Sequence, residues 1–214
     1  MLISFSSKAQ EVDLDSLWGV WNNKTQPDTN RLKAMKSIAY DGYLFTQPDS
    51  AFYFAQMAYD FAEARNNKKW MAAALNIQGV SFKEKQNYEK SLEFFENSLQ
   101  ISKVLDDLKQ MYYSYFEMGQ VYLAQGDFEN ALKFLQKSIE LADKQGDLVS
   151  LARSLGDIGI VYFRKGDNVK AIESYTKSIK IFEELGLKMK TVPSLCNIGN
   201  IYYREGDDST LCSK

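Results

Sequence analysis

The chain has 214 residues, of which 45% are hydrophobic and 14% aromatic, and this composition predicts a folded protein with a packed core. Its 26 basic and 28 acidic residues are interspersed and give a formal net charge of −2, so a surface that attracts nucleic acid is not expected. Only three prolines occur, outside the long periodic segments, and the alternation typical of strands does not recur, which indicates an all-α fold.

The N-terminal residues 1–10 leave two interpretations open. Residues 2–5 (LISF), followed by small residues, are similar to the end of the apolar region of an export signal, but the charged region that should precede it is missing. The segment is therefore either a truncated signal peptide, which would make the mature protein periplasmic or exported, or an apolar tail of a cytoplasmic protein. No run of about 20 apolar residues that could span a bilayer is present in the sequence.

Residues 11–23 are expected to form an N-terminal capping helix. Leu14, Leu17, Trp18 and Trp21 recur at helical spacing and form one apolar stripe. Both tryptophans fit core packing better than ligand binding, because large aromatic side chains bury most of their surface in folded proteins.

A degenerate first repeat is expected near residues 31–68. Its second helix should begin near Pro48, because a proline in the first helical turn lacks an N–H that would have no partner there. Ala51, Ala55 and Ala58 then follow at helical spacing.

Four segments repeat at a constant step of 40 residues, centred on Gly79, Gly119, Gly159 and Gly199. Each glycine lies on a helical apolar stripe, where it leaves a notch that lets a neighbouring helix come close. A second stripe follows in the same register and offers bulky side chains that such a notch can receive. Its members are Ser91, Phe95 and Ser98, then Ala131, Leu135 and Ser138, then Ala171, Tyr175 and Ser178.

Glycine-aspartate pairs at 126–127, 166–167 and 206–207 separate the two stripes. A glycine suits the end of one helix, and an aspartate suits the cap of the next, so each unit is predicted to be a helix-turn-helix hairpin. The repeats are expected near 71–108, 111–148 and 151–188, with a half repeat at 191–206 and a truncated tail at 207–214.

This pattern resembles the tetratricopeptide repeat, in which a large residue, leucine-glycine and tyrosine on one helix precede alanine and an apolar residue on the next. The resemblance covers residues 72–206, with a weaker copy that extends the array back to Arg31. It implies an all-α, right-handed superhelical solenoid of antiparallel helix pairs. The family period is usually about 34 residues, so helices or turns must be longer here. With its forty-residue period, the chain resembles the sensor arrays of bacterial signalling proteins that carry cyclase, histidine kinase or DNA-binding output domains.

The first helices of such an array line a concave groove that binds a protein or peptide partner. Positions one residue beyond the packing stripe, about 100° around each first helix, are predicted to face this groove. For Phe116 and Phe163, packing into the adjacent repeat is an open alternative. The predicted groove residues are Asn76, Val80, Lys83, Tyr113, Phe116, Gln120, Leu123, Arg153, Ile160, Phe163, Asn200 and Tyr203.

One recognition mode of the resembled family is not expected. Tetratricopeptide domains that clamp a C-terminal carboxylate place lysine, asparagine and further basic residues on successive first helices. The equivalent positions here are Ile77, Glu117, Asp157 and Asn197, which do not supply that set.

The last helix is expected to lack a partner, because no second helix follows residues 206–207. Its face with Ile198, Ile201 and Tyr202 should then be uncovered. The chain is therefore expected either to be a fragment of a longer protein or to form a homodimer through this helix.

No catalytic residue, cofactor or metal site is expected. Histidine is absent, which removes the commonest general base and metal ligand, and no phosphate-binding, nucleophile or calcium-loop motif occurs. The predicted function is a non-enzymatic scaffold that binds a protein or peptide, as the sensing region of a larger signalling protein. The alternatives are a self-associating structural array and, less favoured, a helical-repeat nucleic-acid binder, for which the mixed charge is unsuited.

Overall fold

The computed structural model describes residues 13–211, with side chains to residue 206, and confirms an all-α helical repeat. The segment 1–12, which carries the export-signal question, and residues 212–214 lie outside the described part. No helix in residues 13–211 combines the length and the apolarity that a bilayer span requires. The elements are α1 (Leu14–Asn22), α2 (Asp28–Ser37), a π-helical turn η1 (Ile38–Tyr43), α3 (Pro48–Glu63), α4 (Lys68–Glu84), α5 (Tyr88–Val104), α6 (Leu108–Gln125), α7 (Phe128–Gln145), α8 (Leu148–Lys165), α9 (Asn168–Glu184), a 3₁₀ helix η2 (Lys188–Thr191) and α10 (Val192–Leu211).

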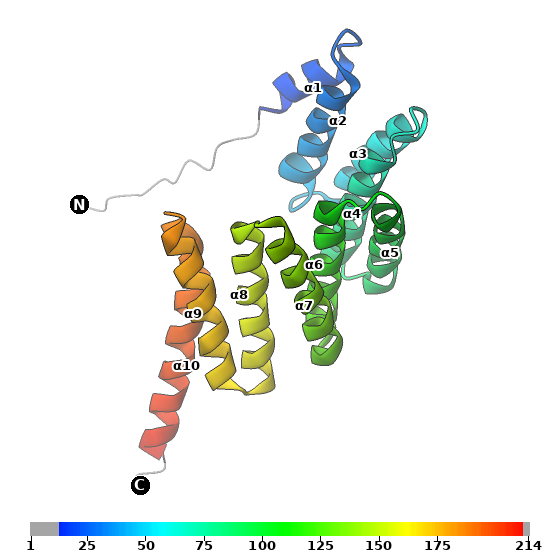
Figure 1. The fold of residues 1–214 in the computed structure, drawn as a ribbon. Helices are drawn as coiled ribbons and strands as arrows, with labels where there is room; N and C mark the ends of the chain where they lie inside the picture. The colour runs from blue at the N-terminus through cyan, green and yellow to red at the C-terminus, as the bar shows by residue number, and fades with distance from the viewer. Residues whose placement is uncertain (1–12, 212–214) are drawn as a thin grey trace, which may run out of the picture. The chain divides into compact units, whose positions relative to one another are not determined.

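The helices form two compact units whose boundary, between residues 94 and 95, falls within α5. In the first unit, α1 packs on α2, and α3 packs on α2 and α4 (Figure 1). Trp21 belongs to the buried core of this unit, and Trp18 meets Phe54 edge-on with ring centroids 5.3 Å apart. The predicted core role of both tryptophans is therefore confirmed.

The second helix of the first repeat, α3, begins at Pro48 as predicted. Ala51, Ala55 and Ala58 are buried along one face of this helix. Small side chains on that face let α3 approach its neighbours closely, as the alanine spacing indicated.

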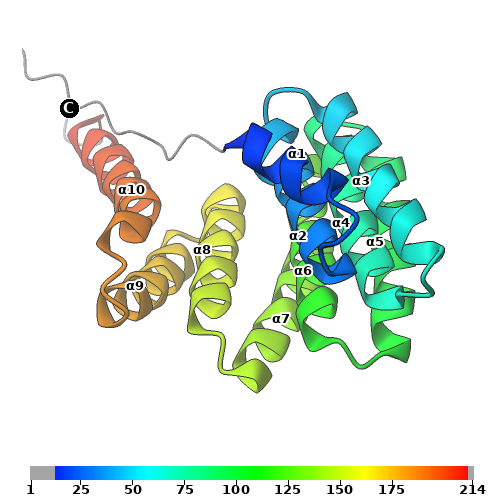
Figure 2. The same cartoon turned by 90° about the horizontal axis from the view of Figure 1, so that it is seen from above.

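In the second unit, α6 with α7 and α8 with α9 form two antiparallel hairpins, and α10 packs against α9 (Figures 1 and 2). Both α6 and α7 have 18 residues, and two-residue links at 126–127 and 146–147 follow them. These four segments account for the whole 40-residue period. The additional length relative to the usual repeat therefore lies in the helices, because links of two residues leave no room for it.

The glycine notches of α6 and α8 hold the side chains that the second stripe predicted. A methyl group at Gly119 would lie 2.7 Å from Leu135 Cγ, and one at Gly159 would lie 2.5 Å from Tyr175 Cε1. Such distances are far below a van der Waals contact, so only glycine permits these helix crossings. At Gly199 nothing lies within 4 Å, because no helix follows α10 in the described chain.

The helix ends recur every 20 residues and use the left-handed conformation. Gly126 has φ +79° and Gly166 has φ +80°, and the aspartate after each caps the next helix by accepting a backbone N–H, as predicted. Non-glycine residues occupy three equivalent positions with φ between 49° and 58°. These residues are Asn66, Gln86 and Asp106.

Two predictions for the last helix are wrong. The pair at 206–207 does not end a helix, because α10 continues to Leu211. A glycine inside a helix costs only about 1 kcal/mol, which is too little to end α10 at this position. Ile201 is not uncovered but fully buried against Ala171 and Tyr175 of α9, whereas the neighbouring Tyr202 is 59% exposed.

Replacing Gln86 by glycine should raise the free energy of unfolding by about 1 kcal/mol, because its φ of 58° strains any residue with a Cβ. The matched control is Gln86→Ala, which keeps the Cβ and should give no comparable gain. Urea denaturation of both variants checks this, and an equal gain for alanine would contradict the assignment of strain.

Candidate functional site

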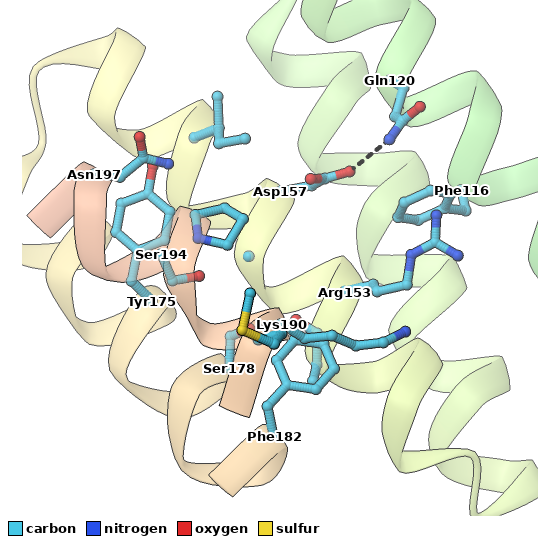
Figure 3. A pocket seen from close by; sticks show the side chains of 15 residues that line it. Phe116, Gln120, Arg153, Asp157, Tyr175, Ser178, Phe182, Lys190, Ser194 and Asn197 are labelled. Carbon is cyan, nitrogen blue, oxygen red and sulfur yellow. Dashed lines mark hydrogen bonds between the residues drawn. The ribbon is translucent and has the colours of Figure 1, made fainter. Parts of the chain in front are cut away.

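A pocket of about 410 Å³ lies in the second unit (Figure 3). Its lining comes from three successive first helices, α6, α8 and α10, together with α9 and η2. The pocket therefore lies on the side of the hairpins that the sequence predicted to bind a partner.

Phe116 on α6 supplies an aromatic wall. Its ring stacks on Tyr112 with a centroid distance of 5.6 Å, and the Tyr112 hydroxyl donates to the Ser150 carbonyl at 3.2 Å. The guanidinium carbon of Arg153 lies 4.9 Å from the centroid of the Phe116 ring. A cation over a ring face is held in place without using its N–H donors, so Arg153 is both positioned and able to donate.

A polar bridge crosses the pocket between α6 and α8. The Gln120 side-chain amide donates to a carboxylate oxygen of Asp157 at 3.0 Å, as the dashed line in Figure 3 marks. This hydrogen bond holds both side chains in position in the pocket lining. It also occupies one of the acceptor sites of the Asp157 carboxylate.

Tyr175 on α9 joins the glycine notch to the pocket. Its ring fills the notch at Gly159, and only 1% of its surface is exposed. Its hydroxyl points to the Asn197 side chain (Figure 3), although no hydrogen bond of normal geometry forms with a described residue. Burial raises the pKa of Tyr175 to about 12; a weak hydrogen bond with the Asn197 side chain opposes the rise, and the charge of Asp157 adds to it. The hydroxyl is therefore protonated at neutral pH, with Asn197 as its polar neighbour.

The side of the pocket formed by η2 faces solvent. Met189 is 84% exposed, and Lys190 next to it is exposed as well. Phe182 on α9, which is 4% exposed, adds a buried aromatic side chain to the same lining. The pocket thus combines apolar walls with cations at its edge.

Four of the twelve predicted groove residues line this pocket. They are Phe116, Gln120, Arg153 and Ile160. Phe116 also packs in the buried cluster that α6 shares with α7 and α8, which was the open alternative for this residue. Contact of these four with a ligand stays a prediction.

Other predicted residues of the second unit lie outside the pocket lining. Tyr113 meets Tyr112 edge-on at 5.4 Å, and Leu123 is 8% exposed. Phe163 lies under the Arg204 guanidinium, 5.1 Å from it, which is a contact within the chain.

The remaining predicted residues fall into an exposed and a buried group. Asn200 and Tyr203 are exposed on α10, the latter to 72%. In the first unit, Asn76 and Val80 are 7% and 4% exposed, and the Lys83 side chain is 16% exposed. Backbone or side-chain movement would be needed before the buried pair could touch a ligand.

Sequence reasoning missed eleven of the fifteen lining residues, among them Tyr175, Lys190 and Asn197. Tyr175 was assigned to the core, yet it stands where the other repeats have Phe95 and Leu135, and a hydroxyl at that position was a signal of a polar requirement. Lys190 lies in a 3₁₀ segment, to which helical periodicity does not apply.

Comparison with known proteins relates this fold to one repeat family. The sequence model of the tetratricopeptide repeat matches residues 70–144 and 110–184, which together make up more than half of the chain. No curated protein matches the chain in sequence.

Solved structures share the fold at low identity. BtubC (BKLC) from P. vanneervenii is 18% identical with a TM-score of 0.62, over 80% of this chain and 71% of that one. Kinesin light chain repeats from Podosopora anserina give 15% and 0.63, over 84% and 89%. A STAND ATPase with a tetratricopeptide repeat sensor from Pyrococcus horikoshii is 15% identical with a TM-score of 0.68. The match covers 86% of this chain but only 28% of that protein. Identities this low show similarity of fold alone.

Tyr175→Phe should raise the free energy of unfolding by about 1 kcal/mol, because it removes a buried hydroxyl that makes no hydrogen bond of normal geometry with its neighbour Asn197. Tyr112→Phe is the matched control and should lower it by about 1 kcal/mol, since that hydroxyl donates to a carbonyl. Both values come from denaturant titration. A loss in Tyr175→Phe equal to that in Tyr112→Phe would show that the Tyr175 hydroxyl is satisfied.

Proposed function

Because this chain belongs to the tetratricopeptide repeat family, whose members are generally protein-interaction scaffolds, we propose that it binds a segment of a partner protein in the pocket of its second unit. The segment lies across the first helices α6, α8 and α10. The role is binding, with no chemical step.

The single observation that carries this proposal is the pocket itself. It is concave, it has aromatic walls at Phe116 and Phe182, and its polar groups are fixed by contacts such as that between Gln120 and Asp157. Peptide sites need apolar anchors for affinity and a few placed polar groups for orientation, and this lining supplies both.

The chemistry of the described residues supports a role in binding rather than catalysis. Among residues 13–206 no cluster of acidic or cysteine side chains could hold a metal ion. Three carboxylates have a lowered pKa for structural reasons: Asp127 and Asp167 cap helices and accept hydrogen bonds from Asn130 and Lys170, and Glu173 accepts from Lys177 one turn along α9. A place within a larger signalling protein is the finer form of the proposal, supported by the fold shared with the sensor of the STAND protein.

Self-association through α10 is a second candidate, favoured by one observation. The notch at Gly199 is open, whereas those at Gly119 and Gly159 each receive a bulky side chain. Leu195 and Tyr202 on the same helix are 51% and 59% exposed, so a second copy could cover them.

The pocket is tested by two neutral polar substitutions of exposed apolar residues. Met189 lines the pocket and is 84% exposed, whereas Val169 is 78% exposed and does not line it. Peptides selected by the wild-type protein from a randomised displayed library should bind Met189→Asn about tenfold more weakly, which corresponds to about 1.4 kcal/mol. Val169→Asn should bind them with unchanged affinity.

Equal affinity of both variants would remove the pocket from the proposal. Neither substitution should change the free energy of unfolding by more than about 0.5 kcal/mol, because both sites are exposed. Sedimentation of the unliganded protein reports on the second candidate, since a monomer at the concentrations of the binding assay would exclude self-association.

A further inference from the structure

The pocket lies where one repeat lacks an aromatic pair that the preceding repeat has. On α6, Tyr112 and Phe116 stand one turn apart, and their rings stack with centroids 5.6 Å apart in the buried cluster that α6 shares with α7 and α8. Forty residues later, α8 has Ala152 and Gly156 at the equivalent positions, and both line the pocket. The pocket therefore takes the place beside α8 that aromatic rings fill beside α6.

Gly156 is not required by the packing of the helices around it. A methyl group there would lie 3.6 Å from the hydroxyl oxygen of Ser178 and 3.7 Å from that of Ser194, which are ordinary van der Waals distances. Both serines lie on the side of the pocket away from α6 (Figure 3). At Gly159, by contrast, a methyl group would come within 2.5 Å of the Tyr175 ring. Glycine inside a helix is less stable than alanine, so Gly156 weakens α8 without relieving a clash, and its effect is to leave the pocket open.

The groups that hold the aromatic pair have equivalents in the pocket lining. The Tyr112 hydroxyl donates to the Ser150 carbonyl, and the Arg153 guanidinium lies 4.9 Å from the centroid of the second ring. Forty residues after this serine and this arginine stand two residues that line the pocket, Lys190 and Pro193. The exposed proline ring replaces the guanidinium, so an apolar group lies where the preceding repeat covers its aromatic side chain.

Phe182 on α9 restores part of the missing bulk. Its side chain is 4% exposed and lines the pocket, and it stands where α7 has Ala142, a member of the cluster around the stacked rings. One ring thus takes the place of two, and a pocket of about 410 Å³ remains. Sites of about 300 to 1,000 Å³ hold drug-sized ligands, so this space admits a single aromatic side chain.

We infer that the partner segment anchors itself by one aromatic side chain, which lies over Gly156 beside Phe182 and Pro193, in the place that Phe116 fills one repeat earlier. This inference rests on the proposed function, because it names the anchor that the same pocket accepts. An aromatic ring is favoured over an aliphatic group because ring pairs gain stability beyond the area they bury. Gly156 is then the residue that determines specificity, since any larger side chain there occupies the space of the anchor.

The test begins with a randomised displayed peptide library selected on the wild-type protein. Phenylalanine, tyrosine or tryptophan should be enriched at one position of the bound peptides. Replacement of that residue by alanine should weaken binding to the wild type about thirtyfold, as expected for a central anchor.

Gly156→Phe gives α8 the side chain that α6 has at the equivalent position and should close the pocket. The alanine replacement in the peptide should change the affinity for this variant by less than about threefold, because the anchor can no longer enter. Its melting temperature should equal or exceed that of the wild type, since a helix glycine is removed and a ring is buried. Gly156→Met, whose side chain is flexible, fills the same space if the phenylalanine variant does not fold.

Gly199→Phe is the matched control. It makes the same substitution at a helical glycine that has no atom within 4 Å and does not line the pocket. The full loss of about thirtyfold on alanine replacement in the peptide should persist in this variant.

The outcomes separate this inference from the proposed function. Selected peptides that lose affinity in Met189→Asn but carry no aromatic residue at a fixed position would leave the pocket in place and overturn the inference. A full loss on alanine replacement in the folded Gly156 variants would overturn it as well, since the ring would then bind elsewhere. A library from which the wild type enriches no peptide would overturn both.

Discussion

The absence of a side chain at one position of each first helix is the constraint on which the second unit depends. Leu135 and Tyr175 occupy the space that a methyl group at Gly119 or Gly159 would need, at distances of 2.7 and 2.5 Å. Since protein interiors are close-packed, these contacts fix how near the two helices of a hairpin lie and at which register they cross. The constant 40-residue step repeats that contact and makes successive hairpins equivalent.

Small polar side chains join closely packed helices of the second unit. The hydroxyls of Ser138 on α7 and Ser154 on α8, which belong to successive hairpins, lie 2.8 Å apart. Within the α8–α9 hairpin, Ser178 donates to the Ala152 carbonyl at 2.7 Å. Each of these hydroxyls is buried and hydrogen-bonded, so the close approach of the helices leaves none of them unpaired. Tyr175 differs from these serines: it fills a notch as Leu135 does, but its buried hydroxyl points to Asn197 without a hydrogen bond of normal geometry (Figure 3).

Much of the fold follows from the sequence because repetition makes local signals redundant. The notch glycines, the second stripe and the capping aspartates recur in register, so each supports the others, and the helix that begins at Pro48 is found by spacing alone. The pair at 206–207 shows the limit of this reasoning. Its residues match a turn, but a single glycine costs a helix only about 1 kcal/mol, and α10 continues through the pair to Leu211. Only part of the site could be predicted from the sequence. Periodicity places Arg153 and Gln120 on the first helices, but Lys190 comes from a 3₁₀ segment, to which the helical period does not apply.

The most direct test of this account is the free energy of unfolding of two alanine substitutions at equivalent glycines. Gly159→Ala must displace the buried ring of Tyr175 and should cost about 1 to 3 kcal/mol, whereas Gly199→Ala meets no atom within 4 Å and should gain up to about 1 kcal/mol from lower backbone entropy in the unfolded chain. Opposite signs at these two positions are the predicted result. A gain at both would show that α8 and α9 do not depend on the missing side chain, and it would contradict the packing on which the pocket is built.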